Sequence, residues 1–187
     1  MAAPREAKKA DTRARLMRET ARLVITQGTE RTTVADVAAA VGVSARTFHN
    51  YFTSREEALE EFAATRAILL KEELRSAGSH ANLIDTVEGL VLDSLTSAPM
   101  ECVDNIVALS RVCTILETLQ GEYTCPLTFP EDESGDFRFA FQAIIAIAWA
   151  AVDAYHQLPE PRDPSDGENI VREAFGLARR LSEIEIP

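Results

Sequence analysis

The sequence is short of the residues from which metal sites and disulfide frameworks are built. Its 187 residues include only three cysteines, Cys102, Cys113 and Cys125, and three histidines. The cysteines do not follow a zinc-binding spacing, so we expect no metal site. We predict free thiols in a reducing compartment, with Cys113 inside a helix core, and keep a thiol redox switch as the alternative.

Catalytic motifs are missing as well. The chain holds no GxSxG, HExxH, GxGxxG or P-loop pattern. Its histidines, His49, His80 and His156, are scattered, and no cluster of His with Cys or of paired carboxylates suggests a site. We therefore expect neither an enzyme nor a cofactor.

Long apolar runs are also absent. The longest apolar segment, Phe139 to Val152, is interrupted only by Gln142 and is shorter than the roughly 18 residues a membrane helix needs. The N-terminus carries charges but lacks the apolar stretch of a secretory signal. We therefore expect a cytoplasmic protein with no membrane partner.

Charge is distributed unevenly along the chain. The net charge is −11, which by itself is unfavourable for binding nucleic acid. Residues 1–55, however, carry ten Lys or Arg and five Asp or Glu, a net charge of +5, and the rest carries −16. A basic N-terminal third can attract phosphates, and the acidic remainder should face away from them.

Hydrophobic residues make up 46% of the chain and recur at helical rather than alternating spacing. This predicts an all-α protein with about nine helices, in which residues 101–120 form one or two. We expect helices near 11–27, 33–41, 44–52, 54–76, 81–97, 101–120 and 136–158, and one from 165 onward. Residues 1–10 are predicted to be a flexible basic arm, and 121–135 a loop.

Residues 33–52 predict two short helices joined by a tight turn. The first has apolar residues at i, i+3, i+4 and i+7, on one face of a helix: Val34, Val37, Ala38 and Val41. Thr33 and Asp36 have the spacing of a capping box, and Gly42 supplies the positive φ of a sharp turn.

The second helix separates an aromatic face from a polar one. Ser44 is a good N-cap, and the inner face consists of Phe48, Tyr51 and Phe52. The outer residues are small, cationic, or able to form hydrogen bonds: Ala45, Arg46, Thr47, His49 and Asn50. A short helix with such a face can lie in a DNA major groove.

From Asp11 to Leu59 the sequence resembles the DNA-binding domain of the TetR family of bacterial transcriptional regulators. The resemblance is carried by a basic first helix, TT at 32–33, the segments VAAAVGVS and TFHNYF, and the following SREEAL. It implies a three-helix helix-turn-helix domain at 11–55, with the motif at about 33–52. It also implies a helical ligand-binding and dimerisation domain at 56–187.

The resemblance implies DNA contacts around the second helix of the motif. Thr47, Tyr51 and Thr33 would bind phosphate and His49 bases, whereas Arg46 fits guanine or phosphate. Some relatives carry a long basic residue where this chain has Ala35. The expected DNA-binding residues are Thr33, Ser44, Ala45, Arg46, Thr47, His49, Asn50, Tyr51 and Arg55. The arginines of the first helix are expected to point outward: Arg13, Arg15, Arg18 and Arg22.

The rest of the chain implies a dimer and a small-molecule pocket by resemblance in architecture. The apolar helix and the last helix would pair across a dimer interface that includes Ile144, Ala148, Val152, Phe175, Ala178 and Leu181. A hydrophobic effector would contact Phe62, Arg66, Val91, Ser94, Val112, Ile115, Phe141, Ile145 and Trp149. For each pocket residue, a place in a plain helical core is the stronger interpretation.

Together these observations predict a TetR-like regulator, most simply a repressor. It would bind an inverted-repeat operator in double-stranded DNA as a homodimer and be released by a hydrophobic small-molecule effector. Two alternatives stay open: a helical interaction protein, and a redox-responsive regulator without a small-molecule ligand.

Overall fold

The computed structural model describes residues 4–76, 82–96, 103, 105–127, 135–159 and 161–180. These residues form eight α-helices and one 3-10 helix, with no strand among them, which confirms the all-α class. The helix count differs slightly from the predicted nine because residues 106–120 form one helix. The elements are α1 (Pro4–Gln27), η1 (Thr29–Arg31), α2 (Val34–Val41), α3 (Ala45–His49), α4 (Arg55–Ser76), α5 (Leu83–Thr96), α6 (Ile106–Gln120), α7 (Gly135–His156) and α8 (Pro164–Arg180).

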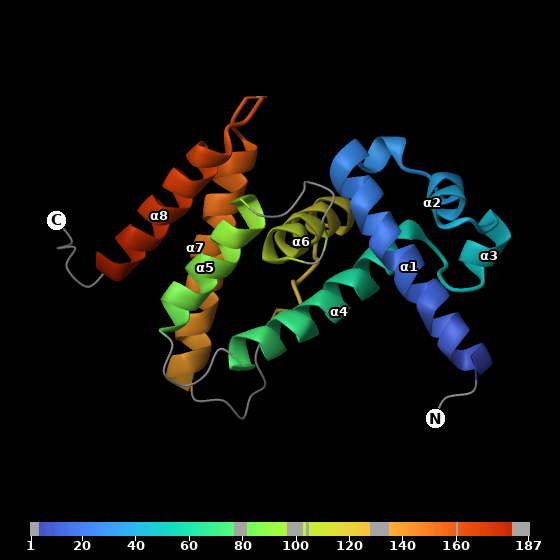
Figure 1. The fold of residues 1–187 in the computed structure, drawn as a ribbon, viewed down its shortest axis with the longest axis horizontal. Helices are drawn as coiled ribbons and strands as arrows, with labels where there is room; N and C mark the ends of the chain where they lie inside the picture. Colours follow the sequence, from blue (N-terminus) through green and yellow to red (C-terminus); the bar gives the residue numbers. More distant parts are fainter. Residues whose placement is uncertain are drawn as a thin grey trace.

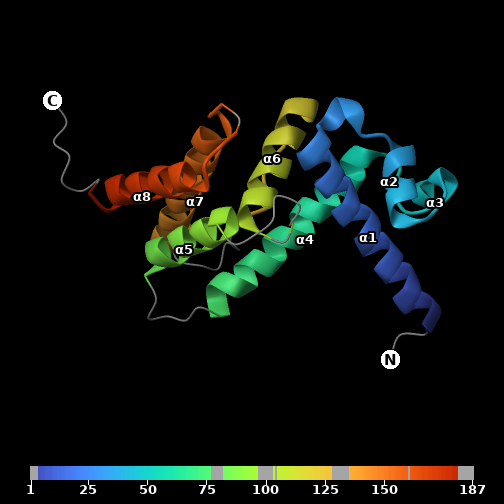
Figure 2. The same cartoon turned by 45° about the horizontal axis from the view of Figure 1, so that its top comes forward.

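The helices form an elongated molecule with two ends (Figure 1). The elements α1, η1, α2 and α3 gather at one end, and α5, α7 and α8 pack together at the other. The long helix α4 runs from the first end toward the second, and α6 lies between them (Figure 2). We call α1 to α3 with the start of α4 the headpiece, and α5 to α8 the body.

The first helix begins earlier than the sequence suggested. Pro4 occupies its first position. A proline is well tolerated there because the first N–H groups of a helix have no partner within the helix, so the N–H that proline lacks is not needed. Residues 4–10 are therefore helical, and the predicted flexible arm is wrong for them. Residues 1–3 lie outside the described part of the chain.

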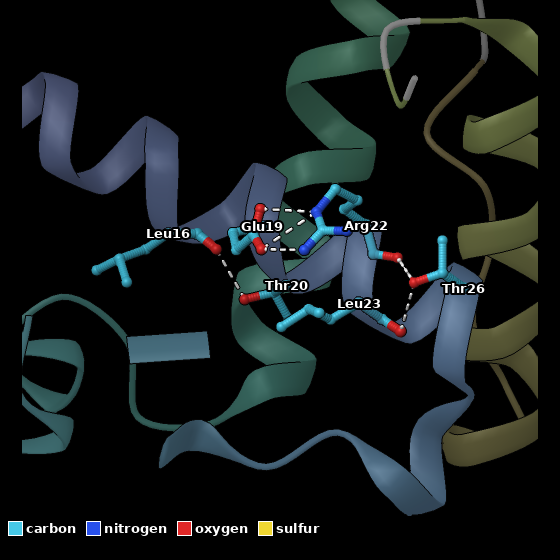
Figure 3. A network of polar contacts seen from close by, with 6 residues as sticks. All are labelled: Leu16, Glu19, Thr20, Arg22, Leu23 and Thr26. Carbon is cyan, nitrogen blue, oxygen red and sulfur yellow. Dashed lines mark hydrogen bonds and ion pairs between the residues drawn. The ribbon is translucent and has the colours of Figure 1, made fainter. Parts of the chain in front are cut away.

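Several polar side chains in the second half of α1 form hydrogen bonds within the helix (Figure 3). Thr20 is fully buried, and its hydroxyl donates to the Leu16 carbonyl at 2.8 Å. Arg22 pairs with Glu19 through three N–O contacts of 2.5–3.1 Å. Because no buried hydroxyl is left without a partner there, this face of α1 can pack against apolar neighbours.

Helix α6 contacts the headpiece at two points. Arg111 donates to the carbonyl of Ile25 in α1 at 3.1 Å, and Gln120 donates to the Glu60 carboxylate in α4 at 2.5 Å. Burial lowers the pKa of Arg111 below its usual value. The helix is thus held against both long elements of the headpiece, one turn after its start and again at its end.

Helix α7 contains an 18-residue window, Phe139–His156, that is long and apolar enough to cross a membrane. The sequence analysis did not expect such a window. The helix packs along α8 and also contacts α5 and α6, and Asp153 lies in its second half. These contacts are those of a helix within a bundle.

Candidate nucleic-acid interface

The turn between α2 and α3 forms as its sequence predicts. The Thr33 hydroxyl accepts from the Asp36 amide at 3.2 Å, and the Asp36 carboxylate accepts from the Thr33 amide at 2.8 Å, which completes the capping box. Hydrogen bonds to the carboxylate from the Thr33 hydroxyl, at 2.6 Å, and from the Thr33 amide hold the pKa of Asp36 below its usual range. Gly42 ends α2 with φ 78° and ψ 33°, a left-handed conformation that a side chain would strain.

Helix α3 is fixed on its inner side by aromatic packing. Phe48 and Phe52 are buried, with ring centroids 5.6 Å apart, and Tyr51 is partly buried beside them. Ser44 caps the helix by accepting from the Thr47 amide at 3.1 Å. The predicted inner face is therefore confirmed.

The outer side of α3 faces solvent. Ala45, Arg46, His49 and Asn50 are exposed, and so is the capping Ser44. Thr47 is partly buried, with its hydroxyl 2.9 Å from that of Ser44. The structure therefore brings the predicted outer residues together on one accessible surface, with the exposed Thr33 at the start of α2.

Arg13 corrects one expectation, because its side chain turns inward. Its guanidinium donates to the Tyr51 carbonyl at 2.7 Å, pairs with Glu61 of α4, and lies 4.4 Å from the Phe52 ring centroid. The hydrogen bond to Glu61 raises the pKa of Arg13 above its ordinary value. Arg13 thus ties α1, the end of the α3 turn and α4 together.

Two further arginines bind backbone carbonyls within the headpiece. Arg15 donates to the carbonyl of Val41, the last residue of α2, at 3.0 Å. Arg55, which we expected to meet a phosphate, donates to the carbonyls of Thr29 and Thr32. Its guanidinium therefore fastens η1 to the start of α4 instead of facing outward.

A polar groove runs between the N-terminal part of α1 and the α3 turn. It encloses about 440 Å³ and is lined by Arg5, Glu6, Lys8, Lys9, Thr12 and Tyr51. The sequence analysis missed this groove because it treated residues 4–10 as a separate arm. Pro4, a residue suited to the first position of a helix, was the signal that α1 begins there.

The residues predicted for an effector pocket divide into two groups. Ile145 and Trp149 line a cavity of about 340 Å³ between α6, α7 and the segment 121–127. The other seven do not line this cavity, and four of them are apolar residues buried in the core: Phe62, Val91, Val112 and Phe141. Ser94 instead donates to the Leu90 carbonyl at 2.6 Å.

The cavity carries polar groups that the sequence analysis did not single out. It is bordered by Glu117, Tyr123 and Gln142, and also by two cysteines, Cys113 and Cys125. Burial raises the pKa of Tyr123 above its usual value. The indole Nε1 of Trp149 is buried without a hydrogen-bond partner in the described residues.

Arg66 is another buried polar residue outside that cavity. Its guanidinium forms two 3.0 Å contacts with Glu73, two turns further along α4, while its Nε has no hydrogen-bond partner among the described residues. Across the described ranges, no three His, Cys, Asp or Glu side chains converge as a metal ion would require.

The predicted dimer residues need a correction. Ala148 and Val152 of α7 and Phe175 of α8 are buried within the chain, because these sides of the two helices face their own neighbours in the bundle. Ile144 and Ala178 are partly buried, and Leu181 lies outside the described residues. Other apolar residues of these two helices are exposed: Phe139, Ala140, Ala143, Ala146, Ala150 and Ala154 on α7, and Leu177 on α8.

Comparison with known proteins agrees with this geometry. Residues 16–62, which span the second half of α1 through the first part of α4, match the family described as bacterial regulatory proteins, tetR family. Over these residues the chain is similar to the TetR family. The match contains the whole α2–turn–α3 unit, so the expected resemblance is confirmed where the sequence analysis placed it.

One curated relative supports the same family. The chain is 36% identical over 126 residues to the HTH-type transcriptional regulator TcmR from Streptomyces glaucescens. That alignment covers 64% of this chain and 55% of TcmR, so it spans only about half the length of the relative.

Solved TetR-family structures share the fold at low sequence identity. The fatty acid degradation regulator FadR from Bacillus halodurans aligns with a TM-score of 0.50 and 14% identity, over 95% of each chain. A TetR-family transcriptional regulator from Haemophilus influenzae aligns with a TM-score of 0.50 and 18% identity, over 90% of this chain and 97% of that one. The combination of an N-terminal helix-turn-helix unit and a helical C-terminal part is thus shared with the TetR fold.

Proposed function

We propose that this TetR-family regulator is a cytoplasmic repressor that binds an inverted-repeat operator as a homodimer. The observation that supports this most directly is the accessible outer face of α3, which is polar, cationic at Arg46 and held from behind by a buried aromatic layer. A rigid helix with this surface suits a major groove, where side chains read base edges.

The side chains divide into two roles. Arg46, His49 and Asn50 are placed on the outer face to reach bases. Thr47, Tyr51 and Thr33, with Lys8 and Lys9 across the groove, are placed to bind the flanking phosphates, which position the helix but do not specify sequence. Arg55 instead holds η1, so we assign it to the support of the headpiece.

We propose a functional boundary near residue 55, where α4 begins. Residues 1–55 carry a net charge of +5, and the rest of the chain carries −16. This separation directs the basic end toward DNA and keeps the acidic end away from it.

Dimerisation is proposed through the outer sides of α7 and α8. These helices run in opposite directions from their connecting turn and pack against each other (Figure 1). Phe139 is 75% exposed and Leu177 is 46% exposed, although both are large and apolar. A second copy covering this surface would remove both from water, and an obligate dimer buries about 2,000 Å² or more.

A hydrophobic small molecule is proposed to occupy the cavity beside Ile145 and Trp149. The cavity volume of about 340 Å³ is in the range of small-molecule sites, and its wall combines apolar side chains with the polar groups of Tyr123 and Gln142. Such a ligand releases DNA only if it binds one arrangement of the two headpieces more tightly than the other.

Selection of bound duplexes from a random DNA pool tests the proposal. We expect an inverted repeat with two half-sites about one helical turn apart. On the selected site, Arg46→Ala and His49→Ala should each weaken binding at least about tenfold, since one bidentate base contact is worth roughly 1–3 kcal/mol. Arg180→Ala, an exposed arginine at the end of α8, is the matched control. Enrichment of no sequence, or full binding by both α3 variants, would refute the proposal.

A further inference from the structure

Two cysteines from different parts of the chain meet at the cavity wall. Cys113 lies in the middle of α6 and is buried, and Cys125 lies in the segment that follows α6 and is partly buried. Their sulfur atoms are 2.9 Å apart, and neither is in a disulfide. A disulfide bond is about 2.05 Å long, so the sulfurs need to approach by only roughly 0.9 Å.

The two thiols are not equivalent. The Cys113 S–H donates toward the Cys125 sulfur, which lowers the pKa of Cys125, and the Leu127 amide and Lys71 lower it further. The same contact, together with burial, raises the pKa of Cys113. Cys125 is therefore the thiol that ionises first, and the thiolate is the nucleophile in thiol chemistry.

A small oxidant can reach this pair from the cavity. Both cysteines line its 340 Å³, together with Thr114, Tyr123 and Gln142. A hydroperoxide is far smaller than this space. The environment thus provides a nucleophilic thiolate, a second thiol in contact with it, and room for the reagent.

We propose that Cys113 and Cys125 form an oxidation site that a small hydroperoxide converts into an intramolecular disulfide. The Cys125 thiolate attacks one peroxide oxygen, the O–O bond breaks, and the leaving oxygen takes up a proton to give water or an alcohol. Cys125 becomes a sulfenic acid. The Cys113 sulfur then attacks the Cys125 sulfur, and the hydroxyl leaves with the Cys113 proton as water. Two thiols lose two electrons, and the peroxide gains them.

The disulfide also changes DNA binding, a consequence that rests on the proposed function. Cys113 lies two residues after Arg111, which holds α6 against α1, and the end of α6 is held to α4 through Gln120. Drawing the middle of α6 toward the segment 121–127 shifts a helix that contacts both long elements of the headpiece. Oxidation therefore lowers operator affinity.

Peptide mapping of the full chain after treatment with hydrogen peroxide tests the oxidation site. Trypsin cleaves after Arg111 and Arg138, so both cysteines fall in peptide 112–138, whereas Cys102 falls in peptide 76–111. After alkylation, reduced protein should carry two labels on peptide 112–138. In oxidised protein, peptide 112–138 should carry no alkyl label and should weigh two hydrogens less than the unlabelled reduced peptide. Cys102 should still be labelled. Further cleavage after Glu117 or Glu122 should leave the two halves joined until a reductant is added.

Variants separate this pair from general thiol oxidation. Cys125→Ser should abolish the link and Cys102→Ser should leave it intact, with melting curves confirming that each variant is folded. Cys113→Ala, which keeps an apolar side chain in the core, should leave Cys125 as a sulfenic acid that a dimedone probe traps. A link that uses Cys102, or no link at all, would overturn the proposal.

Operator binding is measured on the same samples. We expect peroxide to weaken binding of the wild type and Cys102→Ser by roughly 5–150-fold, the usual range of coupling between sites, and dithiothreitol to restore it. Cys125→Ser should bind DNA equally well before and after peroxide. Unchanged affinity with a complete disulfide would overturn the effect on DNA, and absence of binding by reduced protein would instead overturn the proposed function.

Discussion

The headpiece and the body of this protein are held together in different ways. In the headpiece, Arg13, Arg15 and Arg55 reach across from one element to the backbone carbonyls of another. In the body, apolar side chains are buried among α5, α7 and α8, Arg179 of α8 pairs with Asp85 and Glu88 of α5, and Phe139 and Leu177 stay exposed. The headpiece is thus tied together by bonds to backbone carbonyls, whereas the body has an apolar surface that a second copy can cover.

This difference agrees with the roles that we propose for the two parts. A helix that reads DNA must keep its geometry when it is alone in solvent, and charged hydrogen bonds to fixed carbonyls supply directional restraint. A surface that forms a dimer needs accessible apolar area more than directional bonds. Two phenylalanines, Phe48 and Phe139, represent the two cases.

The largest expected effect is the loss of Phe48. It is fully buried between the helices of the headpiece, so Phe48→Ala should lower the free energy of unfolding by about 3–5 kcal/mol. Urea denaturation followed by circular dichroism measures this. Phe48→Leu, which preserves much of the volume, should be much closer to the wild type. An equal loss for both variants would mean that packing at this position does not hold α3.

A smaller loss is expected when Arg13 is removed. Arg13→Ala leaves the Tyr51 carbonyl and Glu61 without their donor, and we expect a cost of about 2 kcal/mol. The ion pair is partly exposed, so solvent screening keeps it from contributing more. Arg13→Lys retains the positive charge but not the several N–H donors of the guanidinium. Its free energy of unfolding should lie between those of the wild type and Arg13→Ala. Stability equal to the wild type would show that the arginine contacts are not restraints.

Substitution of Phe139 should affect association and leave folding unchanged. Phe139→Glu introduces a charge on a side chain that is 75% exposed, so the fold should change by no more than about 0.5 kcal/mol. The dimer dissociation constant, measured by analytical ultracentrifugation, should rise at least about tenfold, or 1.4 kcal/mol. Phe139→Leu serves as control. An unchanged dissociation constant would place the interface elsewhere.

The smallest effect concerns acid and the caps of α2 and α4. Hydrogen bonds from Thr33 lower the pKa of Asp36, and hydrogen bonds from Thr53 lower that of Glu57. Since the folded pKa values are depressed, these carboxylates stabilise the headpiece above their unfolded pKa values, about 4. That contribution is lost as pH falls through the folded values. Asp36→Asn should flatten the decrease in melting temperature between pH 5 and 3, which thermal scans would reveal.

The sequence predicted the headpiece well because its signals are local. The Thr33–Asp36 capping box, Gly42 and the Ser44 cap each act within four residues, and the structure contains all three. The start of α1 was misplaced because Arg5, Lys8 and Lys9 suggested a solvated arm, although Pro4 is compatible with a helix start.

Residues that act over long sequence distances were harder to predict. Arg13 meets Glu61 across 48 positions, and periodicity alone placed its side chain outward. For α7, an apolar residue can face either its own bundle or a second subunit, so periodicity could not tell Ala148 from Ala150. The cavity beside Cys113 and Cys125 depends on the path of a non-helical segment, which has no periodic signal.

The spacing of the half-sites tests the central claim most directly. If two copies of α3 occupy neighbouring major grooves on one side of the duplex, inserting about five base pairs between the selected half-sites turns one of them to the opposite side. We predict that affinity then falls to that of random duplex, and that an insertion of about ten base pairs restores it at least in part. Equal affinity for the selected site and the five-base-pair insertion would contradict paired recognition by a rigid dimer.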